Sequence, residues 1–320
     1  MKHFATLLLA CLLPVTGVAQ TVVHHIGMLE TTSELANRAN LDAFRKGLRE
    51  AGYVEGEHYR IDYRSADGRP DRFPQLALEL VTAKAEVIVT RGFAAARAAK
   101  EAGAPAVVMA TSADPVAAGV VKSLAHPGGN VTGLTTLVSE LAGQRLGLLK
   151  ELAPQSKRIG AMLNLANPTG NAERRQIEAA AKAHGLEVII YDVRDLDGLQ
   201  RSLEAASQRN VDALLVNGEA VLLANRNAIL EFARRHRLPV MYAAREYVEG
   251  GGLIAYGVSY PHLYYRAASY VDRILKGARP GDLPIEKPSK MYLVINVSAA
   301  TALGIPIPSK LLLRADELIR

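Results

Sequence analysis

Short apolar runs rich in β-branched residues alternate along the chain with stretches of helical spacing. Near-continuous apolar runs of this kind are typical of strands that are buried on both faces of a parallel sheet. Between them, apolar residues recur at helical intervals, as at Leu41, Phe44 and Leu48. This alternation predicts an α/β fold with parallel sheets. The expected strands are residues 22–29, 59–64, 86–90, 106–110, 158–164, 186–192, 212–217, 239–243, 253–258 and 292–297.

The order of these elements repeats in the second half of the chain. Such a long internal repeat is not a solenoid and predicts two similar α/β lobes. Three strands of the first half have counterparts in the second half, in the same order: 26–29 and 159–163, 85–89 and 211–215, 104–107 and 238–241.

Extended segments without helical spacing are the expected crossings between the lobes. They lie near residues 133–137, 256–259 and 286–291. We therefore expect the helix that follows the second crossing to return to the first lobe. The predicted division is a first lobe of residues 20–135 plus 259–287 and a second lobe of residues 136–258 plus 288–320.

The first 19 residues have the pattern of a secretory signal peptide. Lys2 supplies the positive charge, residues 4–13 form the apolar stretch, and small residues precede the expected cleavage after Ala19. The apolar stretch is too short to span a bilayer. Lipoprotein processing at Cys11 is a less favoured alternative because this cysteine lies unusually near the start. The segment predicts a periplasmic protein whose mature chain contains no cysteine.

The positive charge is spread over the chain rather than gathered in one patch. The net charge is +6 for the full sequence, and without Lys2 it falls to +5. The densest basic run, residues 234–237, ends a predicted helix, where cations are favourably placed against the helix dipole. We expect this placement, and no nucleic-acid partner, to explain the run.

Catalytic and cofactor motifs are absent from the sequence. There is no G-x-S-x-G nucleophile motif, no phosphate-binding P-loop, and no G-x-G-x-x-G after the first strand. The histidines are scattered and have no zinc-binding spacing. The sequence therefore predicts a protein that is not an enzyme and has no cofactor and no metal.

Candidate ligand-binding residues follow the carboxyl ends of the predicted strands, where open parallel sheets bind ligands. Hydroxyls, amides, carboxylates and aromatic rings gather there, a mixture that suits a small ligand with a carboxylate and an ammonium group. The candidates are Thr31, Thr32, Thr90, Arg91, Thr111, Asp114, Asn167, Asn217, Glu219, Tyr242 and Tyr256.

Several candidates have a structural alternative. Asp114 and Thr32 fit as helix caps, and the tyrosines, Tyr260 included, fit equally as packing residues. Arg91 fits either as a bidentate contact to an anion or as an arginine in an ion pair between the lobes. Glu219 and Glu246 are candidates for binding a ligand ammonium.

Several stretches together resemble the periplasmic substrate-binding proteins of ABC transporters, in the family that includes tryptophan- and tyrosine-type binders. The resemblance covers nearly all of the chain after the signal. It is carried by residues 44–56, 113–116, 126–133, 166–168, 245–251, 256–257, 273–277 and 293–296.

The resemblance implies a type I periplasmic-binding-protein fold, with two Rossmann-like lobes joined by three hinge strands and a ligand between them. It also implies delivery of the ligand to an ABC permease and its ATPase. Arg91 stands where the family has a small residue, which favours a more acidic ligand. We expect a monomer that binds and releases its ligand unchanged.

Alternative functions are a periplasmic sensor subunit with the same fold or, less favoured, an exported enzyme with two lobes. A DNA-binding repressor of similar lobes is disfavoured because a signal segment, not a helix-turn-helix, precedes the first strand.

Overall fold

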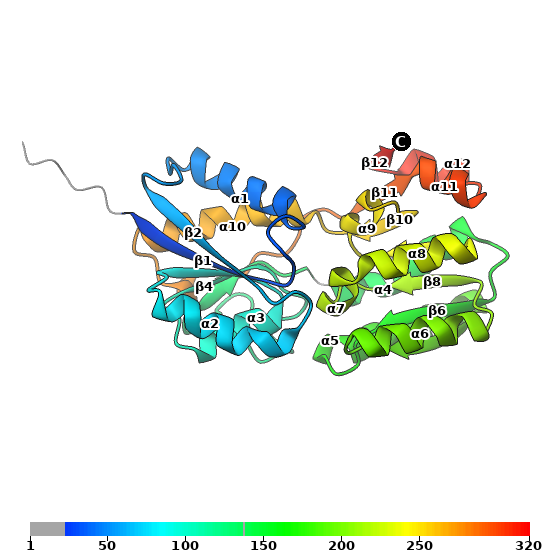
Figure 1. The fold of residues 1–320 in the computed structure, drawn as a ribbon, viewed down its shortest axis with the longest axis horizontal. Helices are drawn as coiled ribbons and strands as arrows, with labels where there is room; N and C mark the ends of the chain where they lie inside the picture. The colour runs from blue at the N-terminus through cyan, green and yellow to red at the C-terminus, as the bar shows by residue number, and fades with distance from the viewer. Residues whose placement is uncertain (1–22, 137) are drawn as a thin grey trace, which may run out of the picture.

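The computed structural model describes residues 23–136 and 138–320 and contains two separate sheets (Figure 1). The first sheet is wholly parallel, with strand order β2-β1-β3-β4-β5. Its strands are β1 (His24–Glu30), β2 (Tyr59–Ser65), β3 (Val87–Arg91), β4 (Val107–Thr111) and β5 (Val131–Gly133). Its helices are α1 (Arg38–Glu50), α2 (Phe73–Thr82), α3 (Phe93–Glu101) and α10 (Tyr260–Leu275), with the 3₁₀ turns η1 (Pro70–Arg72) and η2 (Pro280–Asp282). We call this unit the first lobe.

Both faces of the first sheet are covered by helices. On one face, Ile26, Met28 and Val89 pack with side chains of α1 and α10. On the other face, Ile88 and Met109 belong to a second core with side chains of α2 and α3. Burial on both faces explains the continuous apolar strands of the sequence.

The second sheet has the order β12-β11-β10-β9-β8-β6-β7. Its strands are β6 (Arg158–Leu163), β7 (Glu187–Asp192), β8 (Ala213–Val216), β9 (Val240–Tyr242), β10 (Ile254–Gly257), β11 (Tyr292–Asn296) and β12 (Glu317–Ile319). Its helices are α4 (Val138–Leu152), α5 (Pro168–His184), α6 (Leu196–Gln208), α7 (Ala220–Ala224), α8 (Arg226–His236), α9 (Arg245–Glu249), α11 (Val297–Leu303) and α12 (Ser309–Arg314). We call this unit the second lobe.

The expected α/β class and all ten predicted strands are confirmed, with two differences. The pairing of β10 with β11 is antiparallel, whereas every other pair is parallel. The two short strands β5 and β12 were not predicted, because neither lies in a longer apolar run, whereas the equally short β9 does.

The chain passes between the two sheets three times. The passages run from β5 to α4, from β10 to α10, and from the segment after η2 to β11. Two of these passages lie side by side, because Leu134 bridges Glu286 and the Thr135 amide donates to the Glu286 carbonyl at 2.9 Å. We propose that the lobe boundaries lie within these passages, near residues 135, 258 and 287.

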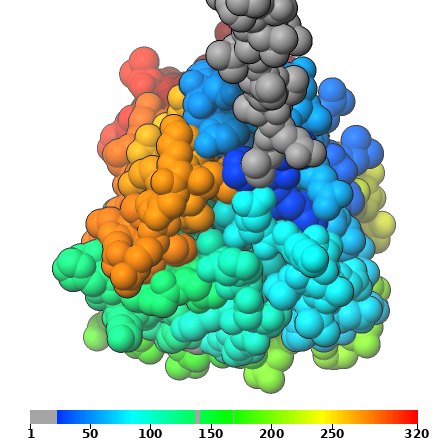
Figure 2. Space-filling view, turned by 90° about the vertical axis from the view of Figure 1, so that its left-hand side faces the viewer, coloured from blue at the N-terminus to red at the C-terminus, as the bar shows by residue number. Residues whose placement is uncertain are grey.

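Helix α10 returns to the first lobe and packs closely on α1. Figure 2 looks onto the outer end of this lobe, where the orange helix lies against the blue one. The close approach depends on Gly47, since an added Cβ would lie 2.7 Å from both Ala268 Cβ and the Tyr265 carbonyl oxygen. A segment 210 residues distant in sequence is thus fixed to α1 by the absence of one side chain.

We expect Gly47→Ala to destabilise the protein by about 1–3 kcal/mol, because helices α1 and α10 would have to move apart. Urea unfolding followed by circular dichroism measures the change. Gly143→Ala is the matched control, since an added Cβ in α4 meets Ala180 Cβ at an ordinary 3.5 Å. Equal stability of Gly47→Ala and the wild type would contradict the packing described here.

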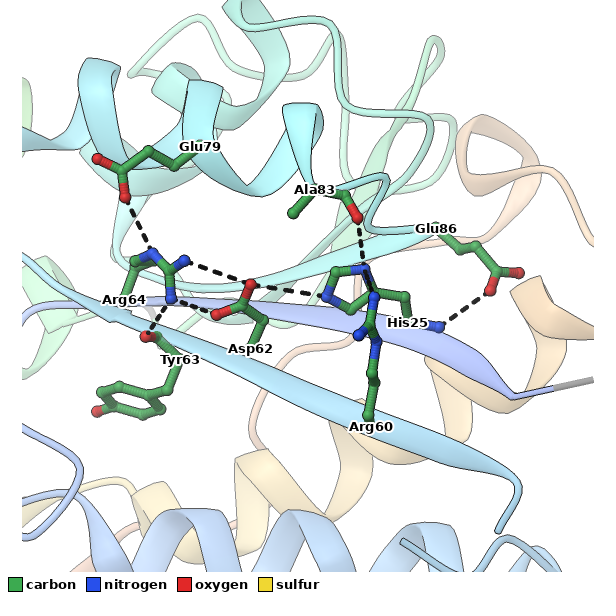
Figure 3. A network of polar contacts seen from close by, with 8 residues as sticks. All are labelled: His25, Arg60, Asp62, Tyr63, Arg64, Glu79, Ala83 and Glu86. Atoms are coloured by element: carbon green, nitrogen blue, oxygen red, sulfur yellow. Dashed lines mark hydrogen bonds and ion pairs between the residues drawn. The ribbon is translucent and has the colours of Figure 1, made fainter. Parts of the chain in front are cut away.

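A polar network covers the edge of the first sheet beneath α2 (Figure 3). Arg64 on β2 pairs with Asp62 on the same strand, and its Nε lies 3.0 Å from Glu79 Oε2 of α2. At the amino end of β1, the ring of His25 contacts the Ala83 carbonyl at 2.8 Å, and its amide donates to Glu86 at 3.0 Å. The network ties β1 and β2 to α2 and to the segment after it, from His25 at the amino end of β1 to Arg64 near the carboxyl end of β2.

Two features are absent from the part of the chain that the structure describes. Across 23–136 and 138–320, no helix is long and apolar enough to cross a membrane. In the same ranges, no three His, Cys, Asp or Glu side chains are grouped so that they could hold a metal ion.

Candidate functional site

A cavity lies between the lobes, at the carboxyl ends of strands from both sheets. This is the edge at which parallel sheets expose helix N-termini and loop side chains. The first lobe contributes the loops after β1, β3 and β4, and the second lobe contributes those after β6 and β8. A ligand held here would touch both lobes.

Six predicted site residues line this cavity, and Tyr260 also borders it. They are Thr31, Arg91 and Thr111 from the first lobe and Asn167, Asn217 and Glu219 from the second. All six lie at or just after the carboxyl ends of strands, where the sequence placed the candidate residues.

The other five predicted residues are not among those that line this cavity. Asp114 caps a turn, its Oδ1 accepting from the amides of Val116 and Ala117 at 3.2 and 2.9 Å. Thr90 is fully buried within β3, one residue before Arg91, because successive strand residues face opposite ways. Thr32 is buried too, and its carbonyl accepts from the Tyr63 hydroxyl at 2.8 Å.

The two predicted tyrosines serve packing rather than the cavity. Tyr242 is 1% exposed and stacks on Tyr247, with ring centroids 4.6 Å apart. Tyr256 packs against the core beneath α4 and α5, and its carbonyl accepts from Arg145 Nε at 2.7 Å. The sequence placed both at strand ends but could not show which way the side chains point.

The wall from the second lobe carries two carboxylates held by amides, the buried Glu173 and the partly buried Glu219. Asn167 Nδ2 donates to Glu219 Oε2, and Asn217 Nδ2 donates to Glu173 Oε2 at 3.1 Å. The Glu219 amide in turn donates to Asn217 Oδ1 at 3.1 Å. Glu173 was not predicted; it lies on α5, beyond the loop, and its only sequence signal is its place in the second turn of a helix that begins at the cleft.

These carboxylates are poorly compensated electrostatically. Burial and the charge of Glu173 raise the pKa of Glu219 to about 8, against the opposing hydrogen bond from Asn167. Burial also raises the pKa of Glu173, which Arg145 and Asn217 partly offset. Arg145 on α4 is itself buried, and burial lowers its pKa. A cation entering the cavity would therefore meet a carboxyl group ready to lose a proton.

The wall from the first lobe carries hydrogen-bond donors suited to an anion. Helix α3 begins here, after Gly92 with φ +84°, and no side chain within 23–136 or 138–320 caps its first turn. The amides of a first helical turn, together with the helix dipole, favour a negative charge. Thr31 lines the same wall, is 5% exposed, and its Oγ1 has no hydrogen-bond partner among the described residues.

Arg91 lines the cavity, but its charge is already compensated. Its Nη2 lies 2.8 Å from Glu246 Oε1 in the second lobe, and its guanidinium lies 4.4 Å from the centre of the Tyr260 ring. Burial alone would lower the pKa of Arg91, yet the charge of Glu246 and further neighbours holds it above its usual value. The ion pair between the lobes is thus the observed alternative, and Arg91 gives no reason to expect an acidic ligand.

Apolar side chains complete the cavity between the two polar walls. Phe73 and Phe93 come from the first lobe, and Val221 and Leu223 come from α7 of the second. Such a combination of apolar surface with a few placed polar groups is typical of a small-molecule site.

A family model for ABC transporter substrate-binding proteins matches residues 25–319. The chain belongs to this family. The resemblance noted in the sequence is thereby confirmed, and the members of the family are solute-binding proteins.

Individual relatives support the same assignment. A tyrosine-binding protein of Clostridioides difficile (strain R20291) is 26% identical over 276 residues, which cover 85% of this chain and 79% of the relative. The structure of an ABC domain from Streptococcus pneumonia in complex with L-Trp has 27% identity and a TM-score of 0.83, covering 93% of this chain and all of the other. The expected type I periplasmic-binding fold is confirmed.

A third relative was solved without ligand. The ligand-free, open structure of a substrate-binding protein with adhesive properties from Clostridium difficile has 26% identity but a TM-score of only 0.66, covering 93% of this chain and 99% of the other. Identity and coverage nearly equal those of the L-Trp complex. The structural similarity to this open relative is thus lower than that to the L-Trp complex, although the sequence similarity is about the same.

Proposed function

We propose that this protein is the periplasmic solute-binding component of an ABC import system and that its ligand is an amino acid with an aromatic or large apolar side chain. The observation that carries the proposal is the cavity between the lobes, with the carboxyl groups of Glu219 and Glu173 on one wall and the start of α3 on the other. The ligand ammonium would face Glu219 and Glu173, and the carboxylate would face α3 and Thr31. The apolar side chain would lie among Phe73, Phe93 and Leu223.

The names of two relatives support this ligand class. One is a tyrosine-binding protein, and the other was solved with L-Trp. We propose further that the protein is exported by its signal segment, which lies outside the described residues, and acts as a monomer. Its partners would be an ABC permease and the ATPase of that permease.

Ligand binding should raise the thermal stability of the purified mature protein. A compound present at 100 times its Kd stabilises the folded state by about 2.7 kcal/mol. We expect L-tryptophan or L-tyrosine to raise the melting temperature in a screen of all amino acids. The matched controls are indole-3-propionate and 3-(4-hydroxyphenyl)propionate, which lack only the ammonium group and should bind far more weakly.

Two outcomes would contradict the proposal. One is a screen in which no amino acid stabilises the protein and X-ray scattering shows no change in compactness on addition of any of them. The other is recovery of a chemically altered ligand after incubation, which would indicate an enzyme. Cell fractionation tests the periplasmic location separately.

A further inference from the structure

A buried ion pair joins the two lobes beside the cavity. Arg91 ends β3 in the first lobe, Glu246 lies on α9 in the second, and their side chains are 7% and 15% exposed. We infer that this pair is an interlobe latch, which lengthens the lifetime of the closed, ligand-bound protein without binding the charged groups of the ligand. The inference rests on the proposed binding function and adds a component that the family resemblance did not lead us to expect.

The guanidinium of Arg91 is engaged on several sides by the protein. Nη2 donates to Glu246 at 2.8 Å, Nη1 donates to Asn37 Oδ1 at 3.3 Å, and the Tyr260 ring lies 4.4 Å away. A ligand carboxylate would have to displace these contacts to form a bidentate pair. Arg91 therefore forms part of the cavity wall, and its charge is directed to the second lobe.

Each partner is held within its own lobe. Arg91 is held by Asn37, which precedes α1, while the buried carboxyl group of Glu30 adds a second attraction from the end of β1. Glu246 is fixed in α9, next to the buried Tyr247. Opening the lobes must therefore separate the pair and break its hydrogen bond between charged groups, a stronger kind than one between neutral groups.

The pair of Arg91 and Glu246 lies near the passage of the chain from β10 to α10, one of the three places where the chain crosses between the lobes. Tyr260, which stacks on Arg91, is the first residue of α10, directly after the chain leaves β10 for the first lobe. A contact made only in the closed form stabilises that form over the open one. Because the ligand leaves after the lobes open, stabilising the closed form should lower the dissociation rate constant of the ligand.

Glu246→Gln tests the latch, because it removes one charge, keeps the size of the side chain and lies outside the cavity lining. The matched control is Glu249→Gln on the same helix, whose carboxylate pairs with Arg245 inside the second lobe at 2.6 Å. Stopped-flow measurements with L-tryptophan and L-tyrosine give both rate constants. We expect Glu246→Gln to raise the dissociation rate constant about tenfold and to leave the association rate constant within twofold.

A second measurement needs no ligand. Spin labels on the otherwise cysteine-free mature chain, at Glu101→Cys in the first lobe and Lys182→Cys in the second, report the interlobe distance. Glu246→Gln should shift the distribution toward longer distances, and Glu249→Gln should not. The interlobe distance can be measured even if the proposed binding function is wrong. Failure of the latch and failure of the proposed function can therefore be told apart.

The double variant Arg91→Met with Glu246→Gln distinguishes a pair from two separate effects. If the two residues act together, the interlobe distances of the double variant should equal those of whichever single variant has the longer distances. The inference would be overturned by an unchanged interlobe distance and dissociation rate in Glu246→Gln. It would also be overturned if Glu246→Gln mainly lowered the association rate or changed the preference between an amino acid and its amide.

Discussion

Glu219→Gln should lower the affinity for an ammonium-bearing amino acid about 100-fold at pH 8.5 and much less at pH 6. Glu219 lines the cavity with a carboxyl group whose pKa is raised to about 8, first by burial and then by Glu173. Above pH 8 it is ionised and attracts the ligand cation. Below pH 8 the wild-type protein must release a proton before the pair forms, so its affinity falls as the pH falls.

Isothermal titration calorimetry in buffers with different ionisation enthalpies measures both the affinity and the released proton. Between pH 6 and 7 we expect close to one proton to leave the wild-type protein on binding, and none to leave from this position in Glu219→Gln. The control is Glu178→Gln, an exposed carboxylate on α5. Wild-type affinity that is constant from pH 6 to 8.5 would rule out the assigned role of Glu219.

The same substitution should stabilise the protein without ligand at alkaline pH. With a folded-state pKa of about 8 against an ordinary value of 4.5, the folded protein binds more protons than the unfolded chain between these values. Unfolding free energy therefore falls as the pH rises through this interval, by up to about 1.4 kcal/mol per pH unit. Glu219→Gln lacks this dependence, so its melting temperature relative to the wild type should increase from pH 5 to pH 8.5.

The sequence was sufficient for most of the fold because buried parallel strands leave a clear apolar pattern. The strands around Ile88 and Leu214 were predictable from residues that pack on both faces of a sheet. Strand β5 was not, since Val131–Gly133 becomes a strand only through its pairing with β4. Pairing is a property of distant segments, and no longer apolar run surrounds Val131–Gly133 to predict it.

The sequence predicted which loops border the site, because these follow the strand ends, but not which side chains reach the cavity. Thr90 and Arg91 are neighbours at one strand end, yet only Arg91 reaches the cavity, because adjacent strand residues face opposite ways. Glu173 lies on a helix rather than in a loop, so its place in the cavity does not follow from the strand ends. The pairing of Arg91 with Glu246 joins residues of different lobes, and its formation depends on how the lobes close, which local pattern does not encode.

Gly68→Ala should weaken ligand binding about 30-fold by preventing full closure of the lobes. Gly68 follows β2 in the first lobe, and an added Cβ would lie 2.5 Å from Ala224 Cβ at the end of α7 in the second. The overlap exists only when the lobes are together, so it penalises the closed form that holds the ligand. Calorimetry gives the affinity, and X-ray scattering with saturating ligand should show a less compact protein.

The chain offers both a control and a suppressor for this variant. Gly56→Ala places alanine at a similar φ, +88° against +74°, but its Cβ would meet nothing within 4 Å, so it shares the backbone strain without the overlap. Ala224→Gly removes the opposing methyl group, and adding it to Gly68→Ala should restore most of the affinity. If Gly56→Ala weakened binding as much as Gly68→Ala, or if Ala224→Gly failed to rescue, backbone strain rather than contact between the lobes would account for the loss.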